Sequence, residues 1–311
     1  MSFLYVLQSL RNPVTDALFS LITLLGEEAL FLAVALMIFW CVDKKNGYYL
    51  MIVSFVGLCF NQFLKLLCRI PRPWVLDPDF PIVEQAREAA TGYSFPSGHT
   101  QTAVGCYGAI ARFTGRRALR ISMIVLTVLV AFSRMYLGVH TPWDVLASLL
   151  IGSVLVLLLY PLITRAMQSP PLMYVIIAVL ILLAVAFTVY VECFPFPADV
   201  DAENLIDGRK NAWTILGCAL AMLVVYTVDL TYLRFDTKAP LPAQCCKLVP
   251  GVALLILLKG VLKAPLLSLF GGHAAAHALR YFIVVLFAGV VWPMTFPLWV
   301  KLFASRSRKP Q

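Results

Sequence analysis

The sequence predicts an all-α fold, a multi-pass transmembrane helical bundle of about nine spans. Two observations carry this prediction. Of the 311 residues, 61% are hydrophobic and 13% are charged, which is more apolar than a soluble domain. The apolar residues also form repeated stretches long enough to cross the hydrocarbon core of a bilayer as helices. The net charge of +9 is therefore assigned to loops that face anionic lipid, and we expect no nucleic-acid partner.

Three consecutive parts are predicted, beginning with an amphipathic interfacial segment at residues 1–27. Leucines at helical spacing on both sides of Pro13 predict two short helices there, lying in the membrane interface. The second part, 28–166, is the predicted catalytic core, with spans at about 29–42, 48–68, 98–112, 119–137 and 143–163. The third part, 167–311, is predicted to add accessory spans at about 172–191, 212–232, 249–270 and 279–303, and a basic tail.

The stretch 133–144 places ionisable residues at the rim between two apolar runs. Ionisable groups at membrane depth are costly and usually functional. Thr141 is a predicted N-cap, so Asp144 falls in the first turn of the next helix and folds back toward His140. A carboxylate on one imidazole nitrogen fixes the tautomer and leaves the other nitrogen free to attack. The alternative interpretation is a helix cap beside a snorkelling Arg134.

Two further segments carry residues suited to binding phosphate. Ser97 is a predicted N-cap and Gly98 lets an anion approach the backbone, so the positive end of that helix offers a phosphate seat. His99 lies on the same rim. Lys65 and Arg72 are seven residues apart, about two helical turns, and are expected to face the same way if the helix runs close to Pro71. Together with the stretch 133–144, these segments predict a phosphoryl-transfer site that uses no metal.

The three segments resemble the signature blocks of the phosphatidic acid phosphatase type 2 (PAP2) superfamily. That superfamily includes lipid phosphate phosphatases, polyprenyl diphosphate phosphatases, glucose-6-phosphatases and the vanadium haloperoxidases. The resemblance covers residues 65–144 and implies a PAP2/haloperoxidase-like helical core. All eleven fixed positions match, in the blocks Lys65-x6-Arg72-Pro73, Pro96-Ser97-Gly98-His99 and Ser133-Arg134-x5-His140-x3-Asp144.

The resemblance also implies a role for each motif residue. His140 is expected to attack phosphorus and form a phosphohistidine, Asp144 to hold the imidazole, and His99 to protonate the leaving oxygen. We expect no metal and no cofactor. The phosphate is expected to contact Lys65, Arg72, Arg134, Ser97 and Gly98.

The leading functional interpretation is a membrane phosphatase that acts on a lipid phosphate, such as phosphatidate, or on a polyprenyl diphosphate. A sugar-phosphate phosphatase is an alternative, because the stretch 72–77 and Lys263-Ala264-Pro265 look like glucose-6-phosphatase. A lipid phosphotransferase would use the same residues. A non-enzymatic transporter is a further alternative, although no motif position is missing. The sequence leaves the oligomeric state open.

Charge asymmetry predicts the orientation in a plasma or inner membrane. By the positive-inside rule, the end of the bundle that carries most lysines and arginines is cytoplasmic. The loops that bear the motifs fall at the opposite end, so the active site is expected to be extracytoplasmic and the C-terminus cytoplasmic. The basic residues used are Lys44, Lys45, Arg112, Arg116, Arg117, Arg120, Arg165, Arg234, Lys238, Lys247, Lys301, Arg306, Arg308 and Lys309.

Four further residues in the third part are conspicuous. An intramembrane Lys259 suggests a carboxylate partner, such as Glu192 or Asp229, or a contact to the substrate headgroup. Snorkelling to the outer rim is the alternative for Lys263. The spacing of His273 and His277 is compatible with a metal site, but no third ligand is in view, so a structural role is favoured.

Overall fold

The computed structural model describes residues 1–88 and 90–304, and the regular structure in these ranges is helical throughout. The predicted all-α class is therefore confirmed. Seven helices in the described part are long and apolar enough to cross a membrane, or up to eight if a bent pair counts as one span. The basic residues Arg306, Arg308 and Lys309 of the predicted tail lie outside the described residues.

The difference from the expected nine spans has a physical reason. Residues 98–113 form three short consecutive helices, α6, the π-helical η3 and α7, which together are shorter than the roughly 20 residues a span needs. The bent pair joins α2 to the helix that continues to Val42, with an angle of 46° at the break. Counting this pair and 98–113 accounts for the predicted number of spans.

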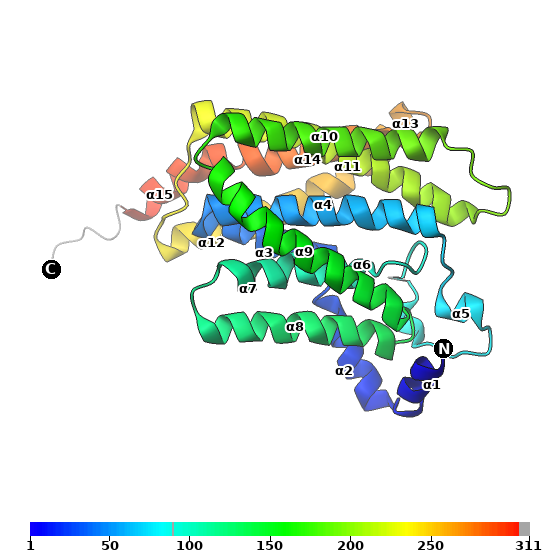
Figure 1. Cartoon of the computed structure of the whole chain (residues 1–311). Coiled ribbons are helices and arrows are strands. Elements are labelled where there is room, and N and C mark those ends of the chain that lie inside the picture. The colour runs from blue at the N-terminus through cyan, green and yellow to red at the C-terminus, as the bar shows by residue number, and fades with distance from the viewer. Residues whose placement is uncertain (89, 305–311) are drawn as a thin grey trace. The chain divides into compact units, whose positions relative to one another are not determined.

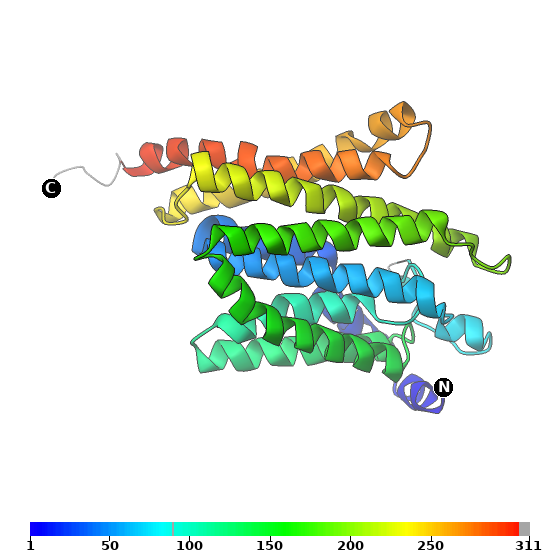
Figure 2. The same ribbon diagram turned by 45° about the horizontal axis from the view of Figure 1, so that its top comes forward.

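The chain divides into two compact units, of which the first comprises Met1–Leu32, Tyr49–Thr164 and Phe194–Gly208. Figures 1 and 2 both show α7 and α8 of this unit running side by side. Its elements are α1 (Ser2–Ser9), α2 (Pro13–Leu24), the start of α3 (Glu28–Met37), most of α4 (Lys44–Cys68), α5 (Pro73–Leu76), the 3₁₀ turn η2 (Glu84–Ala86), α6 (Gly98–Ala103), η3 (Val104–Gly108), α7 (Ala109–Phe113), α8 (Arg117–Tyr136), most of α9 (Pro142–Ala166) and the start of α11 (Ala202–Val228).

The N-terminal helices of this unit pack onto its other elements. Asn12 caps α2, because its side chain accepts hydrogen bonds from the N–H groups of Val14 and Thr15. Gly26, just after α2, lies so close to α8 that an added Cβ would come within 2.6 Å of Val130 Cγ1. The two short helices predicted in residues 1–27 correspond to α1 and α2, while their place in the membrane interface stays a prediction.

The second unit comprises Ala33–Tyr48, Arg165–Cys193 and Arg209–Gln311. Its elements are the end of α3, the π-helical η1 (Ile38–Val42), the start of α4, α10 (Pro170–Cys193), most of α11, η4 (Asp229–Leu233), α12 (Leu241–Val261), α13 (Lys263–Leu269), α14 (Ala276–Leu286), η5 (Phe287–Val291), the 3₁₀ turn η6 (Pro293–Thr295) and α15 (Phe296–Ala304). The three-part division of the chain stays a prediction.

An ion pair between Lys44 and Asp229 joins the start of α4 to η4 in the second unit. Lys44 Nζ lies 2.6 Å from Asp229 Oδ1 and 3.6 Å from the centre of the Phe235 ring. Lys44 is already helical, because α4 begins there and Asp43 accepts a hydrogen bond from the N–H of Asn46 at 2.7 Å. Residues 44–47 are therefore the first turn of α4, with Asp43 as its cap.

Candidate active site

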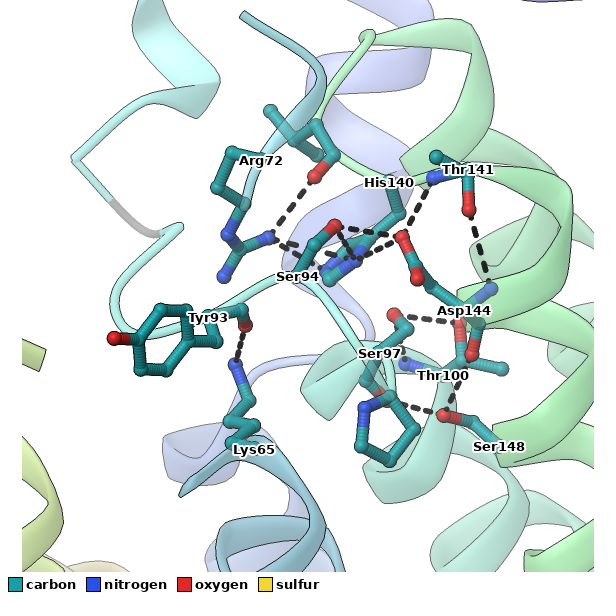
Figure 3. A network of polar contacts seen from close by, with 12 residues as sticks. Lys65, Arg72, Tyr93, Ser94, Ser97, Thr100, His140, Thr141, Asp144 and Ser148 are labelled. Atoms are coloured by element: carbon teal, nitrogen blue, oxygen red, sulfur yellow. Dashed lines mark hydrogen bonds and ion pairs between the residues drawn. The ribbon is translucent and has the colours of Figure 1, made fainter. Parts of the chain in front are cut away.

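The three motif blocks meet in the first unit (Figure 3). His140 lies in the turn between α8 and α9, and Asp144 lies in the first turn of α9. Both residues are only 1% exposed. The imidazole Nδ1 is 3.4 Å from Asp144 Oδ2, so the first turn of α9 does bring the carboxylate back to the imidazole.

The carboxylate of Asp144 is held by two further donors. Thr141 donates its backbone N–H to Oδ2 at 2.7 Å, and Ser94 donates its hydroxyl to the same oxygen at 2.6 Å. Ser94 Oγ also lies 3.5 Å from His140 Nδ1 (Figure 3). Sequence reasoning did not select Ser94, which is fully buried. Hydrogen bonds to a carboxylate are among the stronger ones, so these contacts fix its position beside the imidazole.

The contact with Asp144 indicates the imidazole tautomer. A carboxylate can only accept, and Asp144 Oδ2 lies 3.4 Å from Nδ1, so the hydrogen sits on Nδ1 and the lone pair is on Nε2. Arg72 Nη1 lies 2.9 Å from Nε2 and 3.5 Å from Nδ1, so this cation lies against the ring and does not contact one nitrogen alone.

Lys65 and Arg72 grip the same backbone segment. Arg72 donates to the carbonyls of Thr91 and Gly92 at 2.7 and 3.0 Å, while Lys65 donates to Thr91 and Tyr93 at 3.2 and 2.6 Å. Both side chains are buried, and they share the Thr91 carbonyl. The structure therefore brings these two cations together, but not by helical spacing, because α4 ends at Cys68 and Arg72 lies beyond it.

Arg134 and His99 bring buried polar atoms with no partner into the same site. Arg134 is 0% exposed, and its Nη1 donates a hydrogen bond to Thr23 Oγ1 at 2.6 Å. Its Nε and Nη2, together with His99 Nε2, make no hydrogen bond to any described residue. Buried polar groups are nearly always paired, so such a cluster of unpaired nitrogens fits a site that receives an anionic acceptor. Thr23 on α2 was not predicted.

Burial and neighbouring charge keep His140 neutral. Burial lowers the pKa of this imidazole well below its ordinary value, and the positive charges of Arg72, Arg134 and Lys65 lower it further. A neutral imidazole has the free lone pair that a nucleophile needs. The same charges that suppress protonation would attract an anion to the ring.

Ser97 and Gly98 form the start of α6 beside this cluster. Ser97 Oγ accepts hydrogen bonds from Thr100 N at 3.4 Å and from Thr100 Oγ1 at 3.0 Å, which leaves its own hydrogen to donate. The Ser97 N–H donates to the Asp144 carbonyl at 3.1 Å. At Gly98, the nearest atom to an added Cβ would be Asn61 Oδ1 at 4.0 Å, so the backbone is open there. Direct phosphate contacts by these two residues stay predictions.

The suggested carboxylate partners of Lys259 are engaged elsewhere. Asp229 pairs with Lys44, and Glu192 accepts from Trp213 at 2.8 Å and lies 3.6 Å from Arg209. Lys259 instead lies over the ring of Tyr281, 5.7 Å from its centre. Among the described residues, no three His, Cys, Asp or Glu side chains gather as metal ligands would, so the two histidines at 273 and 277 lack a third ligand.

Comparisons with known proteins point to the same family. Residues 46–168 match the model of the PAP2 superfamily, and residues 213–305 match the model described as PAP2 superfamily phosphatase, transmembrane extension. The chain is 31% identical over 159 residues to a probable sphingosine-1-phosphate phosphatase of Dictyostelium discoideum, covering 47% of this chain and 38% of that protein. It is 30% identical over 149 residues to undecaprenyl-diphosphatase BcrC of Bacillus subtilis, covering 47% of this chain and 73% of that protein.

A sugar-phosphate enzyme is also among the relatives. The chain is 31% identical over 140 residues to glucose-6-phosphatase catalytic subunit 1 of Mus musculus, covering 37% of this chain and 39% of that protein. The alignments with the Dictyostelium and mouse proteins thus span well under two thirds of those relatives. No solved structure matches the chain.

Proposed function

This chain belongs to the PAP2 superfamily, and on that premise we propose that it is an integral membrane phosphatase that hydrolyses a lipid phosphate or a polyprenyl diphosphate. One observation carries the proposal. A buried, neutral His140 is steered by Asp144 and lies against Arg72, with further buried nitrogens of Arg134 unpaired beside it. This is an arrangement for placing a phosphoryl group against a nucleophile.

In the first step, the Nε2 lone pair of His140 attacks phosphorus as the bond from phosphorus to the leaving oxygen breaks. The leaving oxygen takes a proton from His99, which takes that proton up when the anionic substrate enters the site. The product is a phosphohistidine and the free alcohol, or the lower phosphate if the substrate is a diphosphate. Asp144 stabilises the positive charge that develops on the imidazole.

In the second step, water attacks the phosphohistidine. The neutral His99 left by the first step removes a proton from that water as the bond between phosphorus and Nε2 breaks. Phosphate leaves, and both histidines return to their starting states. The step uses the same cluster of cations, so no rearrangement of the site is required between the two steps.

Charge stabilisation in this scheme comes from side chains. Phosphoryl transfer needs mainly positioning and neutralisation of the equatorial oxygens. Three cations, Lys65, Arg72 and Arg134, lie close enough to His140 to lower its pKa. They supply the positive charge that neutralises the phosphate oxygens, without a metal ion. The Ser97 hydroxyl and the Gly98 N–H add donors at the start of α6.

Two relatives support a lipid substrate, since their names give sphingosine-1-phosphate and undecaprenyl diphosphate. The candidate spans put the protein in a membrane, and the tail of a lipid substrate can lie in that membrane. A sugar phosphate is the second candidate, favoured by the glucose-6-phosphatase likeness. We assign catalysis to residues 28–166 and an accessory role to 167–311, with the site extracytoplasmic and the C-terminus cytoplasmic.

The test is phosphate release by purified protein from phosphatidate, a sphingoid phosphate, undecaprenyl diphosphate and glucose 6-phosphate, in the presence of a chelator. We expect turnover of a lipid substrate, and none in His140→Ala. The matched control is His273→Ala, which removes an exposed imidazole from the second unit and is expected to keep wild-type rates. Wild-type rates from a folded His140→Ala, or loss of activity on chelation, would refute the proposed chemistry.

A further inference from the structure

A second cluster of cations lies in the second unit, on the helices that follow the motif-bearing part of the chain. His277 and Arg280 are three residues apart on α14 and are each 7% exposed. Lys263 at the start of α13 and Lys210 on α11 lie close enough to His277 to act on its charge, as does Arg280. None of these residues is used in the proposed chemistry.

The two buried members of this cluster have nitrogens without partners. Arg280 Nε and Nη1 and His277 Nδ1 make no hydrogen bond to any residue the structure describes. No described carboxylate lies within ion-pair distance of Arg280 or Lys263, and Glu192, on α10, is held by Arg209 and Trp213. A buried guanidinium without acceptors or a counter-charge is costly, so the site is built to receive both from a ligand.

The packing of the helices explains why Arg280 is buried. Gly217 on α11 lies against the backbone of Ala278 on α14 so closely that an added Cβ would overlap its carbonyl oxygen. This close approach carries Arg280 into the unit, where it lies over the ring of Tyr281, 4.9 Å from its centre. Lys263 and Lys210 stay exposed, so the cluster has a buried guanidinium and an exposed basic rim.

We propose that this cluster binds the phosphate group of an acidic phospholipid. It lies at the junction of two candidate spans, Leu241–Leu269 and Ala276–Phe303, which is where lipid headgroups meet a membrane protein. The guanidinium of an arginine can donate two parallel hydrogen bonds to phosphate oxygens, and the lysines at the rim attract the negative charge of the headgroup. Val261, the last residue of α12, and Leu269, the last residue of α13, are 60% and 74% exposed and supply an apolar surface for the acyl chains.

The test is the affinity of purified full-length protein, in neutral detergent, for dioctanoyl phosphatidylglycerol. This lipid is a phosphodiester, so it is no substrate for the proposed monoester and diphosphate hydrolysis, and the result is independent of that proposal. Lys263→Gln is expected to weaken binding about fivefold, and Arg280→Gln on the order of tenfold or more. The matched control Lys301→Gln removes another exposed lysine of the same unit and is expected to bind as wild type.

Equal affinities of Lys263→Gln and Lys301→Gln would overturn the site, and this comparison does not depend on whether the buried Arg280 variant folds. Dioctanoyl phosphatidylcholine is expected to bind without distinguishing the variants. Inorganic phosphate is expected not to displace phosphatidylglycerol at equal concentration. Displacement by phosphate from wild type, lost in Lys263→Gln, would overturn the lipid assignment in favour of a soluble anion.

Discussion

Ser94→Ala tests whether the serine beside the catalytic pair positions it. The change removes the hydroxyl that donates to Asp144 Oδ2 at 2.6 Å and lies 3.5 Å from His140 Nδ1. A hydrogen bond to a charged acceptor contributes about 1.5–3 kcal/mol. If that contribution is expressed when positive charge develops on the imidazole, kcat falls about 10- to 150-fold, since each 1.36 kcal/mol is tenfold in rate.

The assay is steady-state phosphate release with a lipid phosphate substrate, separating kcat from KM. Because Ser94 lies on the carboxylate side of the imidazole, KM is expected to stay unchanged. Ser94→Thr keeps a hydroxyl and is expected to recover most of the rate. Thr127→Val is the matched control, because it removes a buried hydroxyl that donates only to the Met123 carbonyl, and it is expected to keep the wild-type kcat. Equal kcat for Ser94→Ala and this control would refute the reasoning.

Three further changes test other contacts. Asp144→Asn is expected to lower kcat about ten-thousandfold, as loss of a carboxylate behind a catalytic imidazole does, and a loss under tenfold would contradict the assigned role. Arg72→Gln removes the charge that most lowers the pKa of His140, so the acid limb of kcat/KM should move up toward pH 6.5, whereas an unmoved limb would contradict the sign. Gly26→Ala places a Cβ 2.6 Å from Val130 Cγ1 and is expected to lower the free energy of unfolding by about 1–3 kcal/mol. The measurement is the midpoint of thermal unfolding, which should fall; an unchanged midpoint would contradict the packing of Gly26 against α8.

The parts of the site that sequence predicts are those whose signal is local. Asp144 reaches His140 because it follows four positions later across a helix start, and a cap at Thr141 sets that start. Lys65 and Arg72 come together, although Arg72 lies beyond the end of α4. Their shared contact with the Thr91 carbonyl is a long-range feature that no spacing reveals.

The parts that sequence does not predict depend on segments without periodicity. Ser94 lies in the irregular stretch before α6, and only tertiary packing brings it to Asp144. Thr23 contacts Arg134 because α2 packs on α8, which an amphipathic pattern alone does not determine. The π-helical turn η3 within the helical stretch 98–113 is likewise a feature that no apolar pattern indicates.

For the cations of the second unit, too, sequence predicts only part of what the structure shows. A lone lysine inside an apolar run predicts a partner, but sequence does not identify which one. In the structure Asp229 forms an ion pair with Lys44, and Lys259 lies over the ring of Tyr281 instead of pairing with Asp229. Charge pairing between helices is set by how they approach, and that approach depends on small contact residues such as Gly217.

The central claim is that His140 forms the covalent intermediate, and trapping that intermediate tests it most directly. Purified protein is mixed with a slow substrate, quenched in alkali, which preserves phosphohistidine, and digested for peptide mass spectrometry. The account predicts phosphoryl mass on His140, formed and lost at rates compatible with turnover, and absent from His140→Ala. Phosphoryl mass on His99 instead, or on no residue under conditions of rapid turnover with labelled substrate, would contradict it.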